Sequence, residues 1–306
     1  MLGRQMATSQ GFANWICGNE LDPTFLKYLF LSEINALHRF SIGATIQTIY
    51  YPDLKAFHVC IPPLAEQQRI VGLLDEAFGG LATAQANAEK NLQNARALFE
   101  SHLNSVFTKR GPGWVDRRLG DILRTGAGGT PLKSKKEYYD GGTIPWLMSG
   151  EVSQGEVTVA TRFITAKGLE NSSARMFPPD TVLVAMYGAT AGQVGILRFE
   201  AATNQAVCGI LPSDKFVPEF LFYFLLAKKD ELVAQATGNA QPNISQIKIK
   251  NTEAPLIPLI EQREIAAKLD ALTEETQRLA RLYERKHAAL EALKKSLLHQ
   301  AFTGEL

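Results

Sequence analysis

Pro63-Leu-Ala-Glu-Gln67 returns 195 residues later as Pro258-Leu-Ile-Glu-Gln262, and this recurrence decides how the chain is organised. The same offset aligns other pairs of segments over about 100 residues. They are Ala7-Thr8-x-Gln10 with Ala202-Thr203-x-Gln205, Pro23-x-Phe25-Leu26-x-Tyr28 with Pro218-x-Phe220-Leu221-x-Tyr223, Gly43 with Gly238, Leu74-Asp75 with Leu269-Asp270, and Phe107-Thr108 with Phe302-Thr303. Two unrelated helical segments of similar composition would not keep Pro and Gly in one register. The sequence therefore contains an internal repeat.

The repeat unit consists of the end of a domain (7–60), a long helical segment (61–108) and a linker. The second copy has about 90 additional residues in front, from Gly111 to Ala201, that the first copy lacks. We therefore expect an N-terminally truncated chain. Its predicted parts are a C-terminal remnant of a first domain (1–60), a central long helix (61–110), a complete second domain (111–258) and a C-terminal long helix (259–306).

Both segments that follow the Pro-Leu-x-Glu-Gln motif carry apolar residues at helical spacing. The second is about 43 residues long, which corresponds to roughly 65 Å of helix. A helix of that length cannot bury its apolar stripe against a small domain alone. Because the stripe of the first helix is rich in alanine, which permits close approach, we predict that the two helices form an antiparallel, coiled-coil-like pair.

The segment between the two helices has the pattern of a small mixed domain. Short apolar runs predict strands at 144–148, 181–187 and 195–199. Pro218 at the first turn and Gly238 just past the end predict a helix between them. The fold class expected for the chain is therefore α+β, with globular domains joined to the two long helices.

Composition excludes several classes of protein. Hydrophobic residues make up 45% of the chain and the formal net charge is +1, which argues against disorder and against a tail that coats a polyanion. Cys17, Cys60 and Cys208 are spaced for neither a zinc site nor a disulfide framework. The sequence has no run of 18 apolar residues and no signal-peptide pattern, so we expect a cytoplasmic protein without a membrane span.

No recognisable catalytic motif is present. The glycine loop Gly126–Gly129 has Pro131 and Leu132 where a phosphate-binding loop would need Gly and Lys, so a plain turn is favoured. The five histidines form no zinc-binding pair, and Asp53-Leu-Lys55, which has the D-x-K half of a metal nuclease motif, has no upstream carboxylate to complete it. The sequence thus favours a protein that is not an enzyme and has no cofactor.

Two polar segments have the chemistry of a DNA-binding surface. Lys133, Lys135, Lys136, Tyr138 and Tyr139 combine three cations with two aromatic hydroxyls, which can contact phosphates and bases. Gln241-Pro-Asn243-Ile-Ser-Gln246 clusters amides that can pair with adenine. When each segment is taken alone, a solvated loop is the favoured interpretation of the first and a polar turn that of the second.

Taken together, these segments resemble the specificity (S) subunit of type I restriction-modification enzymes. Gly128-Gly-Thr-Pro131, Tyr138-Tyr139, Gly141-Gly142, Ile144-Pro-Trp146 and Ser149-Gly150 resemble the start of a target recognition domain in that family. Later motifs of the family are matched by Asn171-Ser-Ser-Ala174, Met186-Tyr-Gly-Ala-Thr190, Gly192-Gln-Val-Gly195 and Ala202-Thr-Asn-Gln205. Pro258-Leu-Ile-Glu-Gln262 resembles the start of its long spacer helix.

The resemblance implies a non-catalytic protein that reads one half of a split double-stranded DNA target. It also implies that the long helices set the spacing of the half-sites and dock two methyltransferase subunits, with a restriction/translocase subunit in the full complex. S-adenosylmethionine, ATP and Mg²⁺ would belong to those partners, and a half-length chain could form a homodimer. The alternative is a helical scaffold protein that reads no DNA.

The first domain departs from the family pattern, and we expect its remnant to expose apolar side chains. Trp146 is expected in the core of the second domain. The DNA-contact residues predicted there are Lys133, Lys135, Lys136, Tyr138, Tyr139, Ser149, Tyr187, Gln241, Asn243 and Gln246.

Overall fold

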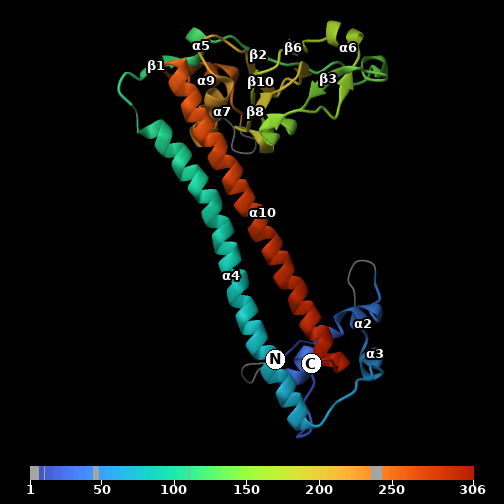
Figure 1. Cartoon of the computed structure of the whole chain (residues 1–306). Coiled ribbons are helices and arrows are strands. Elements are labelled where there is room, and N and C mark those ends of the chain that lie inside the picture. Colours follow the sequence, from blue (N-terminus) through green and yellow to red (C-terminus); the bar gives the residue numbers. More distant parts are fainter. Residues whose placement is uncertain (1–6, 10, 44–47, 110, 236–242) are drawn as a thin grey trace. The chain divides into compact units, whose positions relative to one another are not determined.

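The computed structural model describes residues 7–9, 11–43, 48–109, 111–235 and 243–306. The chain divides into two compact units, unit 1 (residues 1–95 and 278–306) and unit 2 (residues 96–277). Two helices of 45 residues, α4 (Leu64–Thr108) and α10 (Leu259–Thr303), contribute to both units (Figure 1). Among the helices described, none is both long and apolar enough to cross a membrane.

A five-stranded sheet with the order β2-β10-β7-β8-β4 is the centre of unit 2. Its strands are β2 (Thr125–Ala127), β4 (Glu156–Val157), β7 (Val182–Ala185), β8 (Val194–Leu197) and β10 (Val207–Ile210). β10 pairs antiparallel with both β2 and β7, whereas β4 and β8 are parallel. β7 is buried on both faces, which explains why its sequence is an unbroken apolar run.

Alternate residues of β7 enter two different cores. Val182 and Val184 pack with the side chains of helix α7 (Pro218–Ala227), while Leu183 and Ala185 face the opposite side. On that side lies a four-stranded sheet with the order β5-β3-β9-β6. Its strands are β3 (Ile144–Leu147), β5 (Phe163–Ile164), β6 (Met176–Phe177) and β9 (Ala201–Thr203).

Smaller elements complete unit 2. The strands β1 (Val115–Arg118) and β11 (Glu253–Leu256) form a separate antiparallel pair. The short helices are α5 (Leu119–Ile122), η1 (Lys136–Tyr138), η2 (Glu151–Gln154), α6 (Ala166–Glu170), η3 (Gly188–Thr190), α8 (Lys229–Ala234) and α9 (Gln246–Asn251). The mixture of sheets and helices confirms the α+β class.

The single helix predicted from Pro218 to Gly238 is wrong. α7 ends at Ala227, and α8 starts at Lys229. At Lys228 the backbone leaves the helical region, with φ −88° and ψ 0°. With the helix interrupted there, Leu232 of α8 is buried in the same core as the side chains of α7, and this burial favours the arrangement. Gly238 lies outside the described residues.

Unit 1 repeats the helices of unit 2 in the register that the sequence predicts. Its helices α1 (Pro23–Ser32), α2 (Ile34–Arg39) and α3 (Tyr51–Lys55) lie 195 residues before the starts of α7, α8 and α9. α4 and α10 begin and end at equivalent positions of the two copies. The internal repeat is therefore a repeat of structure as well as of sequence.

A buried glutamine near the start of each long helix makes the same three hydrogen bonds in both copies. Gln67 accepts from the Asp22 N–H (2.8 Å) and donates to the carbonyls of Glu20 and Pro62 (both 2.8 Å). Gln262 accepts from the Val217 N–H (2.8 Å) and donates to the carbonyls of Lys215 and Ile257 (both 2.9 Å). The sequence identified the motif but not its role, which is to attach each long helix to the segment preceding α1 or α7.

The long helices run antiparallel within each unit, as predicted. In unit 1, Leu74 near the start of α4 packs with Leu298 and Ala301 near the end of α10. In unit 2, Leu103 near the end of α4 packs with Leu269 near the start of α10. The ends of both helices also meet equivalent rings: Phe302 lies 5.2 Å from Phe25, and Phe107 lies 5.5 Å from Phe220, measured between ring centroids.

Unit 1 exposes apolar side chains whose counterparts in unit 2 are buried. Phe12 and Trp15 are 68% and 47% exposed, whereas Val207 and Ile210, at the equivalent positions in β10, are 0% and 1% exposed. The difference arises because residues 125–185 place β2 and β7 on either side of β10. The expected exposed apolar surface on residues 1–60 is thus observed among the residues described there.

Candidate nucleic-acid interface

The glycine loop at 126–129 brings three backbone segments of unit 2 into close contact. A Cβ atom on Gly128 would lie 2.1 Å from the Thr203 carbonyl oxygen, and one on Gly129 would lie 2.3 Å from the backbone nitrogen of Ala174. The N–H groups of Gly128 and Gly129 donate to the carbonyls of Val207 and Thr203. Because these N–H groups are already bonded, the loop is a packing turn and does not form a phosphate cradle.

The residues that follow the loop line a pocket of about 520 Å³, which we call the β3–β5 pocket. Its described lining consists of Thr130, Lys133, Tyr139, Trp146, Met148, Arg162, Phe163, Asn204 and Gln205. Trp146 is only 4% exposed, and its indole N–H donates to the Gly129 carbonyl at 3.0 Å. Trp146 therefore belongs to the core, as expected, and also forms part of the pocket wall.

Backbone pairing holds the walls of the pocket together. β3 pairs with β5 on one side and with β9 on the other, so Trp146 lies near both Phe163 and the turn at Asn204. Glu151 joins two further wall segments, because it accepts from the Met148 N–H at 2.8 Å and from the N–H and hydroxyl of Thr161 at 3.0 and 2.9 Å. Glu151 thereby positions the residue next to Arg162.

The polar lining of the β3–β5 pocket is rich in hydrogen-bond donors. Within the described part of the chain, neither Lys133 nor Arg162 has an acidic partner, and Arg162 lies against the Met148 sulfur. Asn204 uses its side-chain oxygen to accept from the Ala206 N–H (3.1 Å), and Gln205 uses its oxygen to accept from the Thr130 hydroxyl. Both amides can therefore offer their NH₂ groups to a ligand.

The five loop residues predicted to contact DNA have different environments. Lys133, Lys135 and Lys136 are exposed, and only Lys133 lines the pocket. Lys135 lies 3.8 Å from a carboxylate oxygen of Glu137, and its ammonium lies 5.8 Å from the centroid of the Tyr138 ring. Tyr138 is 7% exposed, so its ring supports the loop and offers little surface to a ligand.

Tyr139 faces the pocket with its hydroxyl already engaged. The hydroxyl donates to the Pro131 carbonyl at 2.5 Å, and burial raises the pKa of this phenol. Its ring meets Trp146 edge-on at 6.1 Å between centroids. Tyr139 can therefore offer a ring surface more readily than a hydroxyl.

The remaining predicted residues are distributed over unit 2. Ser149 is half-buried beside Met148 of the pocket. Tyr187 is 39% exposed and forms an isolated antiparallel bridge with Asn243. The Gln246 amide donates to the Thr125 hydroxyl at 2.8 Å, which ties α9 to β2. Gln241 lies outside the described residues. These DNA-contact assignments stay predictions.

Four pocket residues were not among those predicted from the sequence: Arg162, Phe163, Asn204 and Gln205. Arg162 and Phe163 lie in a mixed polar and apolar stretch without a recognisable motif. Asn204 and Gln205 lie in the recurring Ala-Thr-x-Gln segment, which indicated the repeat and the family resemblance but was not assigned to a binding site. That segment was the one signal that could have pointed to the pocket.

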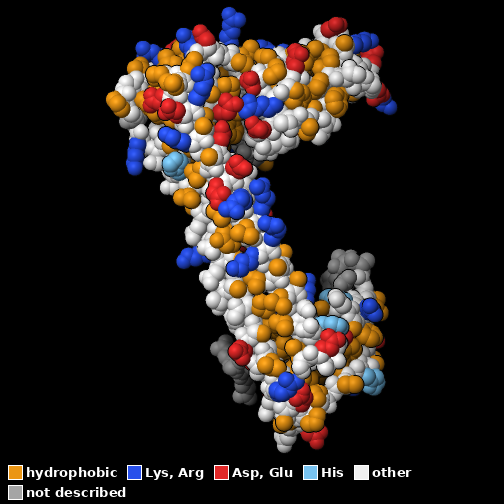
Figure 2. All heavy atoms as spheres, viewed as in Figure 1, with side chains coloured by type: hydrophobic (Ala, Val, Ile, Leu, Met, Phe, Trp, Pro, Cys, Tyr) orange, Lys and Arg blue, Asp and Glu red, His pale blue; other side chains and the backbone are white. Residues whose placement is uncertain are grey.

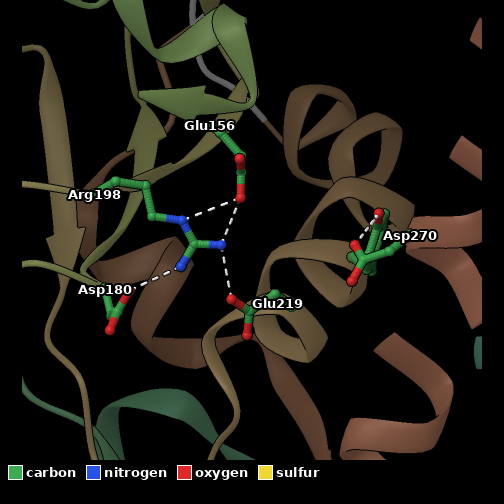
Figure 3. A network of polar contacts seen from close by, with 6 residues as sticks. Glu156, Asp180, Arg198, Glu219 and Asp270 are labelled. Atoms are coloured by element: carbon green, nitrogen blue, oxygen red, sulfur yellow. Dashed lines mark hydrogen bonds and ion pairs between the residues drawn. The ribbon is translucent and has the colours of Figure 1, made fainter. Parts of the chain in front are cut away.

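Several charged side chains in unit 2 form ion pairs. Figure 3 shows Arg198 holding Glu156 (2.6 Å), Asp180 (2.8 Å) and Glu219 (2.7 Å), which links β8 to β4 and α7. Burial opposes the charge on Arg198, but the hydrogen bonds from these carboxylates outweigh it and raise the pKa of the guanidinium. On the face seen in Figure 2, basic and acidic side chains are interspersed. Among the described residues, no group of His, Cys, Asp or Glu could hold a metal ion.

One known protein family matches two separate segments of the chain. The profile of the family described as "Type I restriction modification DNA specificity domain" matches residues 2–91 and again residues 112–284. The two matches fall on the two copies of the internal repeat. They cover most of the chain.

Individual relatives agree with this match. The chain is 25% identical over 218 residues to the Escherichia coli type I restriction enzyme EcoR124I/EcoR124II specificity subunit, covering 69% of the chain and 53% of the relative. It is 31% identical over 189 residues to the Methanocaldococcus jannaschii MjaIX specificity subunit, covering 59% and 43%. The chain thus spans about half the length of these relatives.

Solved structures share the fold. One, from work on complex assembly and conformational transition of the type I R-M system, superposes with a TM-score of 0.80 at 24% identity and covers 94% of this chain and 72% of its own. The HsdS subunit of Thermoanaerobacter tengcongensis gives a TM-score of 0.61 at 24% identity and covers 94% and 71%.

Proposed function

Because the chain belongs to the type I restriction modification DNA specificity domain family, we propose that it reads one half of a bipartite DNA target through residues 112–258 of unit 2. The observation that carries the proposal is the internal repeat, since one family profile matches both copies. Among the described residues, the three sheets and the donor-rich pocket all belong to the second copy. The protein would then be a specificity subunit with no catalytic residues of its own.

We place the DNA on the face formed by the 133–139 loop and the β3–β5 pocket. Lys133, Lys135 and Lys136 are exposed cations that can neutralise phosphates. Arg162 and Gln205 are exposed beside them and can donate to base edges, as Arg and Gln commonly do. The mixed charge elsewhere on unit 2 means that DNA affinity would depend on partner subunits for further basic surface.

The long helices would dock two copies of a type I methyltransferase subunit. Leu98 of α4 and Leu293 of α10 occupy equivalent positions, yet they are 54% and 48% exposed. Ala97 and Ser101 on α4 recur as Ala292 and Ser296 on α10. By contrast, the exposed Leu73 of α4 corresponds to Lys268 of α10, and the exposed Leu282 of α10 corresponds to Asn87 of α4. An exposed leucine kept in both copies, beside small residues, fits two equivalent apolar contacts with the same partner.

The other functions of the family's complexes would reside in partner chains. S-adenosylmethionine would be bound by the methyltransferase subunits, and ATP and Mg²⁺ by a restriction/translocase subunit. The complex would act on double-stranded DNA in the cytoplasm. A homodimer of this chain is the other assembly that we propose to test, because a dimer would also bring two DNA readers together.

The testing experiment is co-purification of the chain with the type I methyltransferase subunit of the same genome, followed by selection of bound DNA from a random duplex pool. We expect a short enriched motif. A complex without a motif would favour the helical scaffold, and a two-part palindromic motif would indicate the homodimer. The motif should disappear when the methyltransferase-free chain is used at physiological salt, if partner surface supplies most of the affinity.

Mass photometry of the same complex tests the docking patches. We expect two methyltransferase copies per chain, one copy for Leu98→Ser or Leu293→Ser alone, and none for the double variant. Leu73→Ser and Leu282→Ser are matched controls, since each removes an exposed leucine at a position where the other copy of the repeat has no leucine. Equal loss in the control variants would contradict the assignment.

A further inference from the structure

The shape of the β3–β5 pocket limits what can enter it. Proteins read base pairs in a duplex by projecting a helix, strand or side chain into a groove about 12 Å wide. The β3–β5 pocket is instead a concave site, lined by Lys133 and Tyr139 of the 133–139 loop and by the buried Trp146. Its volume of about 520 Å³ lies in the range of sites for small molecules. A concave site of this size suits a group that protrudes from the duplex.

The lining of the pocket matches the chemistry of a nucleotide. Lys133 and Arg162 offer two cations, and Asn204 and Gln205 offer amide donors, while none of the described lining residues is acidic. Such a set suits phosphate oxygens together with the acceptor atoms of a base. A cationic or donor-rich ligand would find few acceptors there.

Aromatic side chains supply the surface on which a base could stack. Phe163 is 43% exposed and lies at the edge strand β5, and Tyr139 presents its ring from the facing loop. An exposed phenylalanine beside an arginine without an acidic partner is the combination that proteins use to stack unpaired bases. Phe163 is not among the residues that pack in the core cluster around Trp146, Ile164 and Ala202, whereas Tyr139 is half-buried against that cluster and offers the rest of its ring to the pocket.

We propose that the β3–β5 pocket binds one unstacked nucleotide of the DNA target, with the base against Phe163 and Tyr139 and the phosphate near Lys133 and Arg162. The proposal rests on the proposed DNA-reading function and adds a mode of recognition to it. The site thereby selects DNA that gives up a base at one position, in addition to any contacts with base edges.

The test is a mismatch walk through the motif obtained with the methyltransferase complex. A mismatch makes a base easier to extrude, because the cost of unpairing has already been met. We expect one position at which a mismatch tightens binding by about tenfold, and weaker or unchanged binding at the others. 2-Aminopurine at that position should change its fluorescence when the complex forms.

Variants of exposed pocket residues identify where the base lies. Phe163→Ala and Arg162→Gln should remove the gain, so that mismatched and perfect duplexes bind alike. Val159→Ala and Arg117→Gln change other exposed residues of unit 2 that do not line the pocket, and they should keep the gain. Thermal unfolding of each variant shows that the fold is retained.

The outcomes separate the two proposals. A motif without any mismatch that tightens binding overturns the pocket assignment and leaves DNA reading intact. A gain that survives in both Phe163→Ala and Arg162→Gln also overturns it. Tight binding of free deoxynucleoside 5′-monophosphates without a mismatch gain would assign the pocket to a soluble nucleotide instead. If no motif emerges, the proposed function and this inference both fail.

Discussion

Gln67 and Gln262 allow a test of whether the equivalent hydrogen bonds of the internal repeat stabilise the two units by similar amounts. Each side chain is fully buried and makes three hydrogen bonds to backbone groups. Replacing Gln67 by Leu keeps a similar volume but removes all three bonds. At about 0.5–1.5 kcal/mol for each bond, the expected loss of stability is roughly 2–4 kcal/mol.

The expected loss should be local to one unit. Gln67→Leu should destabilise α1 in unit 1, and Gln262→Leu should destabilise α7 in unit 2 by a similar amount, because the two networks are equivalent. Pulse-labelling hydrogen exchange at increasing urea, read by mass spectrometry on peptides from α1 and α7, measures the two units separately. Gln68→Leu is the matched control, since Gln68 is the exposed neighbour on the same helix.

Two results would refute this reasoning. If Gln67→Leu lowers the stability of unit 1 no more than Gln68→Leu does, the buried glutamine does not attach the helix. The other such result is that Gln262→Leu destabilises unit 2 while Gln67→Leu leaves the stability of unit 1 unchanged. The two copies would then share a sequence pattern without sharing its energetic role.

Three other perturbations have defined outcomes. Burial and the hydrogen bond to Asp75 raise the pKa of Tyr28 from 10.0 to about 12. Because this pKa is higher in the folded than in the unfolded state, the protonated phenol contributes its full stabilisation of the fold below about pH 10. That contribution is lost as the pH rises towards 12. Thermal midpoints between pH 9 and 12 should therefore fall less steeply for Tyr28→Phe than for the wild type, and parallel curves would contradict the effect. Gly128→Ala should lower the urea midpoint by the equivalent of about 2 kcal/mol or more, because its Cβ would lie 2.1 Å from a carbonyl oxygen, while Gly150→Ala, with nothing within 4 Å, should change it little. Lys135→Ala with Lys136→Ala should weaken binding of all DNA sequences about equally and lower the salt dependence of binding, as measured by fluorescence anisotropy; unchanged binding would remove this loop from the interface.

The internal repeat was predictable because it can be recognised from the order of the residues in the sequence alone. Residues such as Pro23, Phe25 and Gln67 recur at a fixed offset, and each recurrence has a local reason: a helix start, a ring contact or a buried amide. The same offset correctly predicted that the long helices start and end at equivalent positions. The antiparallel pairing also followed, since long apolar stripes need a partner.

The candidate site was less predictable because pairing of distant strands creates it. Arg162 meets Trp146 through the pairing of β3 with β5, and Gln205 meets Thr130 through the parallel pairing of β3 with β9 and the packing of Gly128. No local pattern encodes that parallel pair, which joins strands more than 50 residues apart. A local reading of the 133–139 loop therefore found Lys133 and Tyr139 but also included Tyr138, which the fold buries.

The helix predicted from Pro218 illustrates a similar limit. The apolar residues continue through α7 and α8, so the pattern alone gives no reason to interrupt the helix. The interruption at Lys228 follows from the position of the core that receives Leu232. Tertiary burial outweighed the local preference for one continuous helix.

A domain exchange is the most direct test of the proposal that residues 112–258 read one DNA half-site. In the methyltransferase complex, residues 112–258 would be replaced by the corresponding segment of a family member whose half-sites differ, and the bound motif would be selected again from the random pool. We predict that the half of the motif assigned to this domain changes to that of the donor while the rest of the complex assembles as before. An unchanged motif from a correctly assembled complex would contradict the claim.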